Sequence, residues 1–411
     1  MSVITVFSGV FCGEQDIIAD LTASTGYRSV TDSDILSRAQ NASGVSKDKL
    51  RRAFSSKTSV FNKFTQEKEC AIACLKLAMA ELLAEDNLAV CGFSGLLIPK
   101  DISHVIRICL IAEMKHRIRQ AIEKEGLSEK EAKKFIHQAD ADRAAWTNTL
   151  FDQSDPWKES LYDIVIPMNK MDIFKAGALI EGNMLKDIVR PTDQSHKAVK
   201  DFLLTARVEV ALSEQGHIVN VSATDGAVTL TINKHVLMLS RLEEELKSLA
   251  EKVPGVVSVQ TRVGKDYHQS NIYRKHNFEV PSKVLLVDDE REFVQTLSER
   301  LQLRDMGSAV AYDGESALNL VKEDEPEVMI IDLKMPGIDG LEILKKVKAT
   351  QPQIEVIVLT GHGCEADRKQ CMNLGAFAYM QKPVDINLLS ETLKEAHEKI
   401  NQNRKNNNPV K

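Results

Sequence analysis

The sequence predicts an α/β protein with several domains: a parallel sheet between two helical layers at the N-terminus, a small α+β domain in the middle, and a doubly wound (βα)5 domain at the C-terminus. Its 411 residues exceed what one hydrophobic core usually supports. In the first and last parts, short apolar runs alternate with longer helical patterns, which is typical of parallel sheets covered by helices. The middle part instead carries a strong hairpin signal, Thr224-Asp225-Gly226, between two runs of alternating polarity.

The first segment, residues 1–195, opens with an apolar strand that runs directly into a glycine loop. The stretch VFSGVFCGEQDII places Gly9 and Gly13 between this strand and a helical pattern, as in a phosphate-binding loop. Such a loop usually continues with a lysine and a hydroxyl residue, whereas Glu14 and Gln15 follow Gly13 here. Further strands are expected at Leu88–Cys91, His104–Ile111 and Asp163–Ile166, and helices at Lys63–Ala84 and Ala112–Glu125.

The second segment, residues 198–264, begins with an expected helix at Lys200–Gln215. The hairpin follows, then a helix marked by leucines at helical spacing, and then a last strand in VPGVVSVQTRV. Residues 265–281 are polar and show no periodicity, so we expect a linker there.

The third segment, residues 282–400, repeats strand and helix about five times. Its expected strands are KVLLV, SAVAY, VMIID, IEVIVLT and AYMQKP. This order predicts an open parallel sheet whose strands all end at one edge. The closing stretch, residues 401–411, is polar and rich in asparagine, and we expect it to be disordered.

Composition excludes several functional classes. The formal net charge of -6 argues against a protein that binds nucleic acid through bulk positive charge. The seven cysteines contain no CxxC pair, which favours reduced thiols over a disulfide framework or a metal site. No apolar run reaches membrane-spanning length, and the N-terminus lacks the pattern of a signal peptide. We therefore expect a cytoplasmic protein.

Residues of complementary chemistry stand at the strand ends of the third segment. Asp288 and Asp289 follow its first strand, Asp332 ends the third, Thr360 the fourth, and Lys382 follows the fifth. Because these ends gather at one edge of a doubly wound sheet, we expect the side chains to meet. Three clustered carboxylates repel one another and need a cation, and their oxygen ligands suit Mg²⁺. Such a site can balance the charge that develops when a phosphoryl group is transferred to a carboxylate.

The third segment resembles the receiver domain of bacterial response regulators, through the stretches LLVDDE, IIDLKMPGIDG, VLTGHG and YMQKP. The resemblance implies that Asp332 accepts a phosphoryl group, supplied by a sensor histidine kinase or a phosphotransfer protein. It also implies that Mg²⁺ is bound by Asp288, Asp289, Asp332 and the backbone carbonyl of Lys334. Thr360 and Lys382 would contact the phosphoryl oxygens, and the Tyr379 side chain would change rotamer together with Thr360. The resemblance further implies a cis peptide bond at Lys382-Pro383.

The first segment resembles the cytidylate kinase-like family of nucleoside monophosphate kinases. The resemblance is carried by VITVFSGVFCGEQDIIADL, GYRSVTDSDIL, AEMKHRIRQAI, DADRAAW and SLYDIVIP. It implies ATP as donor, CMP as acceptor, Asp32 near the acceptor, and a nucleotide site built from Gly9, Gly13, Arg117, Asp140 and Arg143, with Asp140 paired to Arg143. Family members usually carry a basic residue soon after the loop, whereas two carboxylates, Glu14 and Asp16, stand there in this chain. Whether this domain is an enzyme therefore stays open.

The second segment is similar to the BON domain, an αβ module associated with phospholipid or ligand contact. The stretches VSATDGAVTLTI and VPGVVSVQTRV carry this likeness. The segment shows neither a catalytic constellation nor an evident basic face, so membrane contact rests on the resemblance alone.

Three functions follow from these observations. The first is a two-component response regulator in which phosphorylation of Asp332 controls a kinase-like or BON-like output by a conformational switch. The second is an ATP-dependent nucleotide kinase regulated by its receiver, and the third is a scaffold whose assembly is gated by phosphorylation. No helix-turn-helix pattern follows residue 400, so no DNA-binding output is expected. A second copy of the chain, bound through the receiver, is a further candidate partner.

Overall fold

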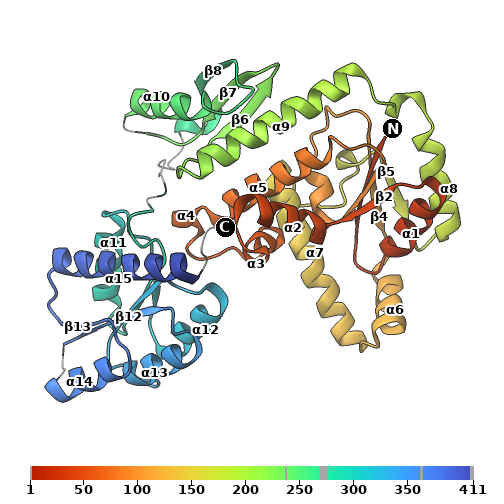
Figure 1. Cartoon of the computed structure of the whole chain (residues 1–411). Helices are drawn as coiled ribbons and strands as arrows, with labels where there is room; N and C mark the ends of the chain where they lie inside the picture. Colours follow the sequence, from red (N-terminus) through yellow and green to blue (C-terminus); the bar gives the residue numbers. More distant parts are fainter. Residues whose placement is uncertain (1, 237, 269–275, 277, 362–363, 408–411) are drawn as a thin grey trace. The chain divides into compact units, whose positions relative to one another are not determined.

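The computed structural model describes residues 2–236, 238–268, 276, 278–361 and 364–407. These residues divide into two units, each described here by itself (Figure 1). The first unit comprises Met1–Thr58 and Glu67–Tyr273, and the second comprises Ser59–Gln66 and Arg274–Lys411. The assignment of residues 59–66 to the second unit is not predicted by the sequence. Within the described residues, no helix is both long and apolar enough to cross a membrane.

The first unit is built on a parallel sheet with the strand order β2-β3-β1-β4-β5. Its strands are β1 (Val3–Ser8), β2 (Arg28–Thr31), β3 (Leu88–Cys91), β4 (Val105–Ile111) and β5 (Ile164–Pro167). Alternate residues of a strand point to opposite faces, and both faces of this sheet are covered. Val3 and Phe7 pack into one buried cluster, and Ile4 and Val6 pack into another. This confirms the predicted three-layer architecture.

Helices cover both faces of this sheet. They are α1 (Glu14–Thr25), α2 (Asp32–Ser43), α3 (Lys47–Arg51), α5 (Glu67–Leu82), α6 (Met114–Glu125), α7 (Glu129–Phe151), α8 (Ile173–Met184) and α9 (Asp193–Ser213), with short 3-10 turns η1 (Arg52–Phe54), η2 (Phe93–Leu97), η3 (Glu159–Leu161) and η4 (Asp187–Val189). Helix α7 begins with a capping box between Ser128 and Glu131, which satisfies two otherwise unpaired N–H groups. The single helix expected at Lys63–Ala84 is instead broken at Gln66, whose φ of 52° is left-handed.

Helix α9 belongs to two hydrophobic cores at once. Val199 and Phe202 pack into the core beside the first sheet, whereas Val208 and Leu212 pack into the core of the middle segment. The boundary expected between residues 195 and 198 is therefore wrong, because it falls inside one continuous helix. The helix joins the two segments by shared packing rather than by a flexible connection.

The middle segment forms a small sheet in the order β6-β7-β8. Strands β6 (Asn220–Thr224) and β7 (Ala227–Ile232) are antiparallel, β8 (Ser258–Val263) runs parallel to β7, and α10 (Leu239–Ala250) packs with them. Asp225 and Gly226 have φ of 53° and 81°, as a two-residue hairpin turn requires, which confirms the predicted hairpin.

The linker expected at residues 265–281 starts too early. Residues Lys265–His268 form the 3-10 turn η5, and Tyr267 is buried in the core of the middle segment. Its hydroxyl donates a hydrogen bond to the carbonyl of Val236 at 3.3 Å. Within the remainder of the expected linker, residues 269–275 and 277 lie outside the described residues.

The second unit contains a parallel sheet in the order β10-β9-β11-β12-β13, which is the predicted doubly wound arrangement. Its strands are β9 (Val284–Val287), β10 (Ser308–Ala311), β11 (Val328–Ile331), β12 (Glu355–Thr360) and β13 (Ala378–Gln381). Its helices are α4 (Asn62–Thr65), α11 (Arg291–Gln302), α12 (Gly314–Asp324), α13 (Gly340–Thr350), α14 (Glu365–Asn373) and α15 (Ile386–Asn407). Alternate strand residues again feed two buried clusters, one on each face.

Helix α15 continues past the point where the sequence predicts a disordered tail. It runs to Asn407, so the expectation fails for residues 401–407, and residues 408–411 lie outside the described part. An ion cluster anchors the extension. The Glu327 carboxylate lies 3.5 Å from Nδ1 of His397 and 3.1 Å from the guanidinium of Arg404. Burial raises the pKa of Glu327, but the two cationic partners outweigh that effect and lower it to about 2.

The Glu327 cluster predicts a specific pH dependence of stability. A carboxyl group whose pKa falls on folding stabilises the folded state above its unfolded pKa near 4.5, and this contribution is lost as the pH falls towards 2. Glu327→Gln should lower the free energy of unfolding of the second unit by up to about 3 kcal/mol at pH 6, and this deficit should shrink between pH 4.5 and pH 2.

Denaturant-dependent hydrogen exchange of peptides from the second unit provides the measurement, because both tryptophans, Trp146 and Trp157, lie in the first unit. Glu395→Gln, an exposed change on α15, the helix that carries the partners of Glu327, is the matched control. An equal deficit at pH 6 and pH 2.5 would contradict the assignment.

Candidate functional site

The predicted site residues stand at the carboxyl ends of the strands of the second unit. Asp288 follows β9, Asp332 follows β11, Thr360 ends β12 and Lys382 follows β13. The register aligns Val287 of β9 with Ile331 of β11, so the residues that follow these strands emerge side by side. Asp288 and Asp332 are buried, whereas Asp289 is exposed.

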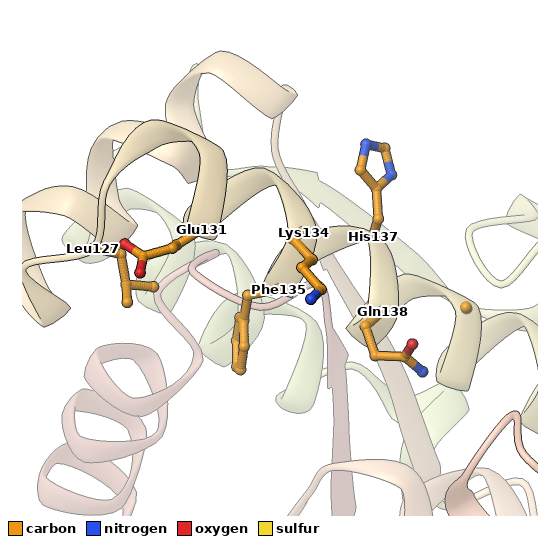
Figure 2. A pocket seen from close by; sticks show the side chains of 7 residues that line it. Leu127, Glu131, Lys134, Phe135, His137 and Gln138 are labelled. Carbon is orange, nitrogen blue, oxygen red and sulfur yellow. The ribbon is translucent and has the colours of Figure 1, made fainter. Parts of the chain in front are cut away.

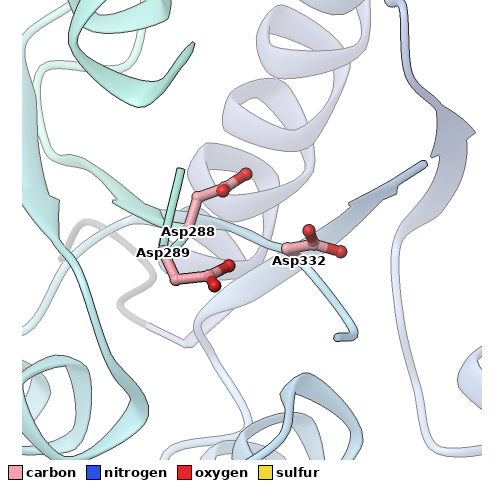
Figure 3. A group of neighbouring side chains, drawn as sticks. All are labelled: Asp288, Asp289 and Asp332. Atoms are coloured by element: carbon pink, nitrogen blue, oxygen red, sulfur yellow. The ribbon is translucent and has the colours of Figure 1, made fainter. Parts of the chain in front are cut away.

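The three aspartates form one oxygen-lined cluster. One carboxylate oxygen from each of Asp288, Asp289 and Asp332 lies within 4.8 Å of the others, and Figure 3 shows the three side chains gathered in one space at the strand ends. The Lys382 ammonium lies 2.8 Å from Asp288 Oδ2 and 3.1 Å from Asp332 Oδ2. The structure therefore brings together the carboxylates and the ammonium that the sequence predicts at this edge.

The positive charge of Lys382 partly offsets the negative charges of the carboxylates around it. Burial raises the pKa of Asp288, against the lowering effect of its hydrogen bond from Lys382. Burial on its own lowers the pKa of Lys382, but the hydrogen bonds to three carboxylates outweigh it and raise this pKa above the usual lysine range. The lysine is therefore held in its charged form where it separates two buried carboxylates.

The fourth and fifth strands supply a hydroxyl and an aromatic side chain. Thr360 is fully buried at the end of β12, and among the described residues a Cβ added to Gly361 would meet no atom closer than Lys382 Cδ at 4.0 Å. Space for a small group therefore exists beside Thr360. The Tyr379 hydroxyl is buried and, among the described residues, has no hydrogen-bond partner. The Lys382-Pro383 peptide bond is cis.

Three neighbours of the site are not singled out by the sequence analysis. Glu290 accepts a hydrogen bond from Lys382 at 2.9 Å, and Phe293 places its ring 4.4 Å from the same ammonium. Gly340 lies against the backbone of Asp332, since an added Cβ would lie 2.0 Å from the Asp332 carbonyl oxygen. The third acid in LLVDDE could have drawn attention to Glu290, whereas the close approach at Gly340 leaves no sequence signal.

This donor set fits a divalent cation of the Mg²⁺ type. Hard cations of this size take oxygen ligands, and the site offers carboxylate oxygens from Asp288, Asp289 and Asp332. Of Lys334, the structure gives the backbone N–H, which donates to Asp332 Oδ1 at 3.3 Å, and the ligand role predicted for its carbonyl stays a prediction.

The glycine loop of the first unit has an unusual backbone conformation and is hydrogen-bonded to the start of α1. Gly13 has φ 78°, and Phe11 has φ 63°, a left-handed conformation that costs a non-glycine residue about 1 kcal/mol or more. Glu14 and Asp16 lie in the first turn of α1, where the helix dipole favours acids. The Ser8 hydroxyl donates to Glu14 Oε2 at 2.9 Å, and Glu14 Oε1 is buried without a partner among the described residues. Burial raises the pKa of Glu14 against the opposing effects of Ser8 and Arg143.

The basic residues expected to face phosphate are engaged within the protein. Arg117 forms two hydrogen bonds to Asp140, at 2.7 and 2.8 Å, and donates from Nε to the Val10 carbonyl at 2.9 Å. Arg143 donates to the carbonyls of Ser8 and Ala139. The predicted pairing of Asp140 with Arg143 is therefore wrong. Asp140 instead pairs with Arg117 of α6, while Arg143 reaches the loop backbone.

Two neighbouring cavities lie near this loop. One, of about 460 Å³, is lined by the loop residues and by Lys124, Phe135 and Arg143. Lys124 binds Asp16 at 2.9 Å, and its position 108 residues away in the sequence hides this role. The other cavity, of about 740 Å³, lies along α7, where Figure 2 shows Phe135 and His137 projecting from opposite sides of the helix.

Asp32, which the family resemblance places near a nucleotide acceptor, forms hydrogen bonds to the turn that follows β3. Its carboxylate accepts hydrogen bonds from the backbone N–H groups of Phe93 and Ser94, at 2.9 and 2.8 Å, and from the Ser94 hydroxyl at 2.6 Å. Burial raises its pKa against these bonds. The carboxylate therefore holds the turn after β3 in place.

Comparison with known proteins assigns the second unit. Residues 284–394 match the family model of the response regulator receiver domain. This part of the chain is a receiver domain. The match covers the strand ends that bear Asp288, Asp332, Thr360 and Lys382, and it confirms the resemblance stated from the sequence.

Relatives and solved structures cover this domain. The transcriptional regulatory protein CpxR of Escherichia coli (strain K12) is 36% identical over 134 residues, which cover 31% of this chain and 57% of CpxR. The uncharacterized transcriptional regulatory protein YesN of Bacillus subtilis (strain 168) is 34% identical over 116 residues, 28% of this chain and 32% of YesN. The chain thus spans about a third to a little over half the length of these two relatives. The receiver domain of the Francisella response regulator 1452 is 27% identical, with a TM-score of 0.28 over 29% of this chain and 98% of that one.

The first unit has its own match. Residues 3–170 match the family model of the cytidylate kinase-like family, which confirms the second predicted resemblance. The likeness of residues 198–264 to the BON domain stays a prediction. The chain therefore joins a receiver domain, typical of two-component signalling, to a cytidylate kinase-like domain.

The paired state of Arg117 predicts the effect of removing its partner. Arg117 is buried, and breaking a buried ion pair leaves an uncompensated charge. Because Asp140 keeps some exposure, we expect Asp140→Asn to lower the free energy of unfolding of the first unit by about 2–3 kcal/mol.

Urea unfolding followed by the fluorescence of Trp146 and Trp157 measures this loss. Glu129→Gln, an exposed change on the same helix, should cost less than about 0.5 kcal/mol. A cost of that small size for Asp140→Asn would show that the pair does not stabilise the loop.

Proposed function

We propose that Asp332 is the phosphoacceptor of a two-component response regulator and that its phosphorylation switches the receiver between two states. The observation that carries this proposal is the cluster at the strand ends, where Asp332 shares one ammonium with Asp288. A carboxylate held beside a charged lysine and two further acids can act as a nucleophile towards phosphorus and have the product charge neutralised in place.

The proposed reaction is a phosphoryl transfer. An Asp332 carboxylate oxygen attacks phosphorus, a new O–P bond forms, and the P–N bond to the imidazole of a phosphohistidine donor breaks, with that nitrogen taking the bonding electrons. The Lys382 ammonium lies 3.1 Å from Asp332, so after the transfer it could form an ion pair with an oxygen of the new phosphoryl group. Mg²⁺, held by Asp288, Asp289 and Asp332, would supply neutralising charge to the phosphoryl oxygens.

The proposed switch uses the two residues on the neighbouring strands. The Thr360 hydroxyl stands next to the space left by Gly361, where it could donate to a phosphoryl oxygen. The Tyr379 hydroxyl, buried without a partner among the described residues, would change rotamer as Thr360 moves. A packed core is bistable rather than continuously deformable, so a small change at Thr360 can select one of two states.

We propose that the cytidylate kinase-like domain is an output that responds by shape, not by catalysis. Glu14 stands where a phosphate loop carries its lysine, and Arg117 is neutralised by Asp140 inside the protein. At about 4 Å, two like charges repel by roughly 1 kcal/mol in water and by more in a drier site, so Glu14 opposes a bound phosphate. A receiver-regulated nucleotide kinase remains the alternative that the test below separates.

Phosphorylation should depend on one side chain. We expect the full chain, treated with acetyl phosphate and Mg²⁺, to gain one phosphoryl mass, and Asp332→Asn to gain none, because the amide cannot act as the nucleophile. Intact-mass spectrometry is the measurement, and Asp305→Asn is the control for replacing an exposed aspartate of the same domain. Acid-labile phosphate that persists on Asp332→Asn would refute the assignment.

Nucleotide kinase activity should be absent. We expect ATP and CMP to give less than about 10⁻² turnovers per second, where kinases typically reach roughly 1–100 per second. The assay is run on the untreated chain, on the chain with acetyl phosphate and on Asp332→Asn, with Glu14→Lys as the variant that supplies a loop lysine. Turnover in the wild-type chain that responds to acetyl phosphate only when Asp332 is present would instead make this a switchable kinase.

A further inference from the structure

Residues 59–66 form a compact turn that leaves the cytidylate kinase-like domain and returns to it. The Ser59 carbonyl accepts from the N–H of Asn62 at 3.0 Å, and the Phe61 carbonyl accepts from Phe64 at 2.8 Å. Gln66, at φ 52°, then turns the chain towards α5. The segment is thus ordered by its own backbone, although it belongs to the second unit.

Phe61 is part of the receiver core. Its side chain is 1% exposed and lies in the buried cluster with Leu285, Val321 and Met329. All other buried members of that cluster come from residues 285–376. An aromatic residue from the first sixth of the chain therefore contributes to a core whose other buried members come from the receiver segment.

Polar and close-packed contacts hold the same segment. The Val60 N–H donates to Asp324 Oδ2 at 2.6 Å, and Asp324 is the last residue of α12. Phe64 lies against Gly307, where an added Cβ would lie 2.7 Å from the Phe64 Cβ. His276 Nδ1 is 3.0 Å from the Phe64 carbonyl oxygen. The contacts lie at the ends of α12 and β10 away from Asp332, so they leave the phosphorylation site free.

The ends of the segment continue without a linker into the first unit. Thr58 and Glu67, its immediate neighbours, belong to that unit. Turn η1 lies a few residues before it and α5 directly after it, and both contribute to the core of the first unit through Phe54, Ala71 and Leu75. The residues on either side of the segment therefore belong to the core of the first unit, whereas Phe61 belongs to the receiver core.

We propose that residues 59–66 are a built-in docking element of the receiver and transmit the state of Asp332 to helix α5. The phosphorylation part of this inference rests on the proposed function, whereas the docking part does not. The cluster that buries Phe61 also contains Val287 and Ile331, which directly precede Asp288 and Asp332. A change of state at the strand ends repacks this cluster, and the segment passes the displacement to the helix that follows it by one peptide bond.

Hydrogen exchange of the untreated full chain tests the docking. We expect Phe61→Ala to speed exchange in residues 307–324 by roughly tenfold or more, because the cavity loosens the packing there. Phe61→Leu should largely retain protection, and Asn319→Gln, an exposed change on α12 outside residues 59–66, should not change it. Unprotected amides at residues 61–66 of the wild-type chain would overturn the docking.

Hydrogen exchange with acetyl phosphate and Mg²⁺ tests the transmission. We expect exchange in residues 59–82 to change in the wild-type chain and in Asn319→Gln, and to stay unchanged in Asp332→Asn and in Phe61→Ala. If Phe61→Ala does not fold, Asp324→Asn, which weakens only the bond to Val60, takes its place and should reduce the response.

The outcomes separate the two claims. A response at residues 67–82 that persists in Phe61→Ala would overturn the transmission, and so would no response in a wild-type chain shown by mass to be phosphorylated. A wild-type chain that takes up no phosphoryl group would refute the proposed function of Asp332, while the exchange of the untreated chain would still decide the docking.

Discussion

The receiver site depends on the repulsion among carboxylates that parallel strands bring to one edge. Asp288 and Asp332 are both buried there, and two buried carboxylates this close repel each other unless a cation lies between them. The Lys382 ammonium lies within about 3 Å of both and also binds Glu290. This single ammonium only partly neutralises the carboxylates of the edge, so the site keeps negative charge that a divalent cation could offset.

The glycine loop of the first unit shows the opposite electrostatic condition. A phosphate-binding loop presents unpaired N–H groups and basic side chains to an anion. Here, the two buried arginines donate to Asp140 and to loop carbonyls, and Glu14 takes the place of the lysine. The strand-loop-helix geometry of a phosphate loop is therefore present, while its two arginines make their hydrogen bonds within the protein.

Within the described residues, two elements connect parts of this chain by packing, namely helix α9 and residues 59–66. Helix α9 packs into two cores of the first unit, so the middle segment cannot move freely from the kinase-like sheet. Phe61 packs in the core of the second unit, although the chain before residue 59 and directly after residue 66 belongs to the first. Both cases place a hydrophobic anchor where sequence order alone suggests a boundary or an uninterrupted helix.

The sequence by itself determined the layered α/β folds, the hairpin at Asp225 and Gly226, and the gathering of Asp288, Asp332, Thr360 and Lys382 at one edge. Strand periodicity and turn chemistry are local, and parallel topology places all strand ends together, so these features follow from short stretches. Only the tertiary structure decided that Asp140 pairs with Arg117 and that Lys124 binds Asp16. The same holds for the contact of α15 with Glu327 and for the packing of Phe61 in the receiver core. These are contacts between residues far apart in the chain, chosen by shape and buried charge, and no local pattern encodes which distant partner will be nearest.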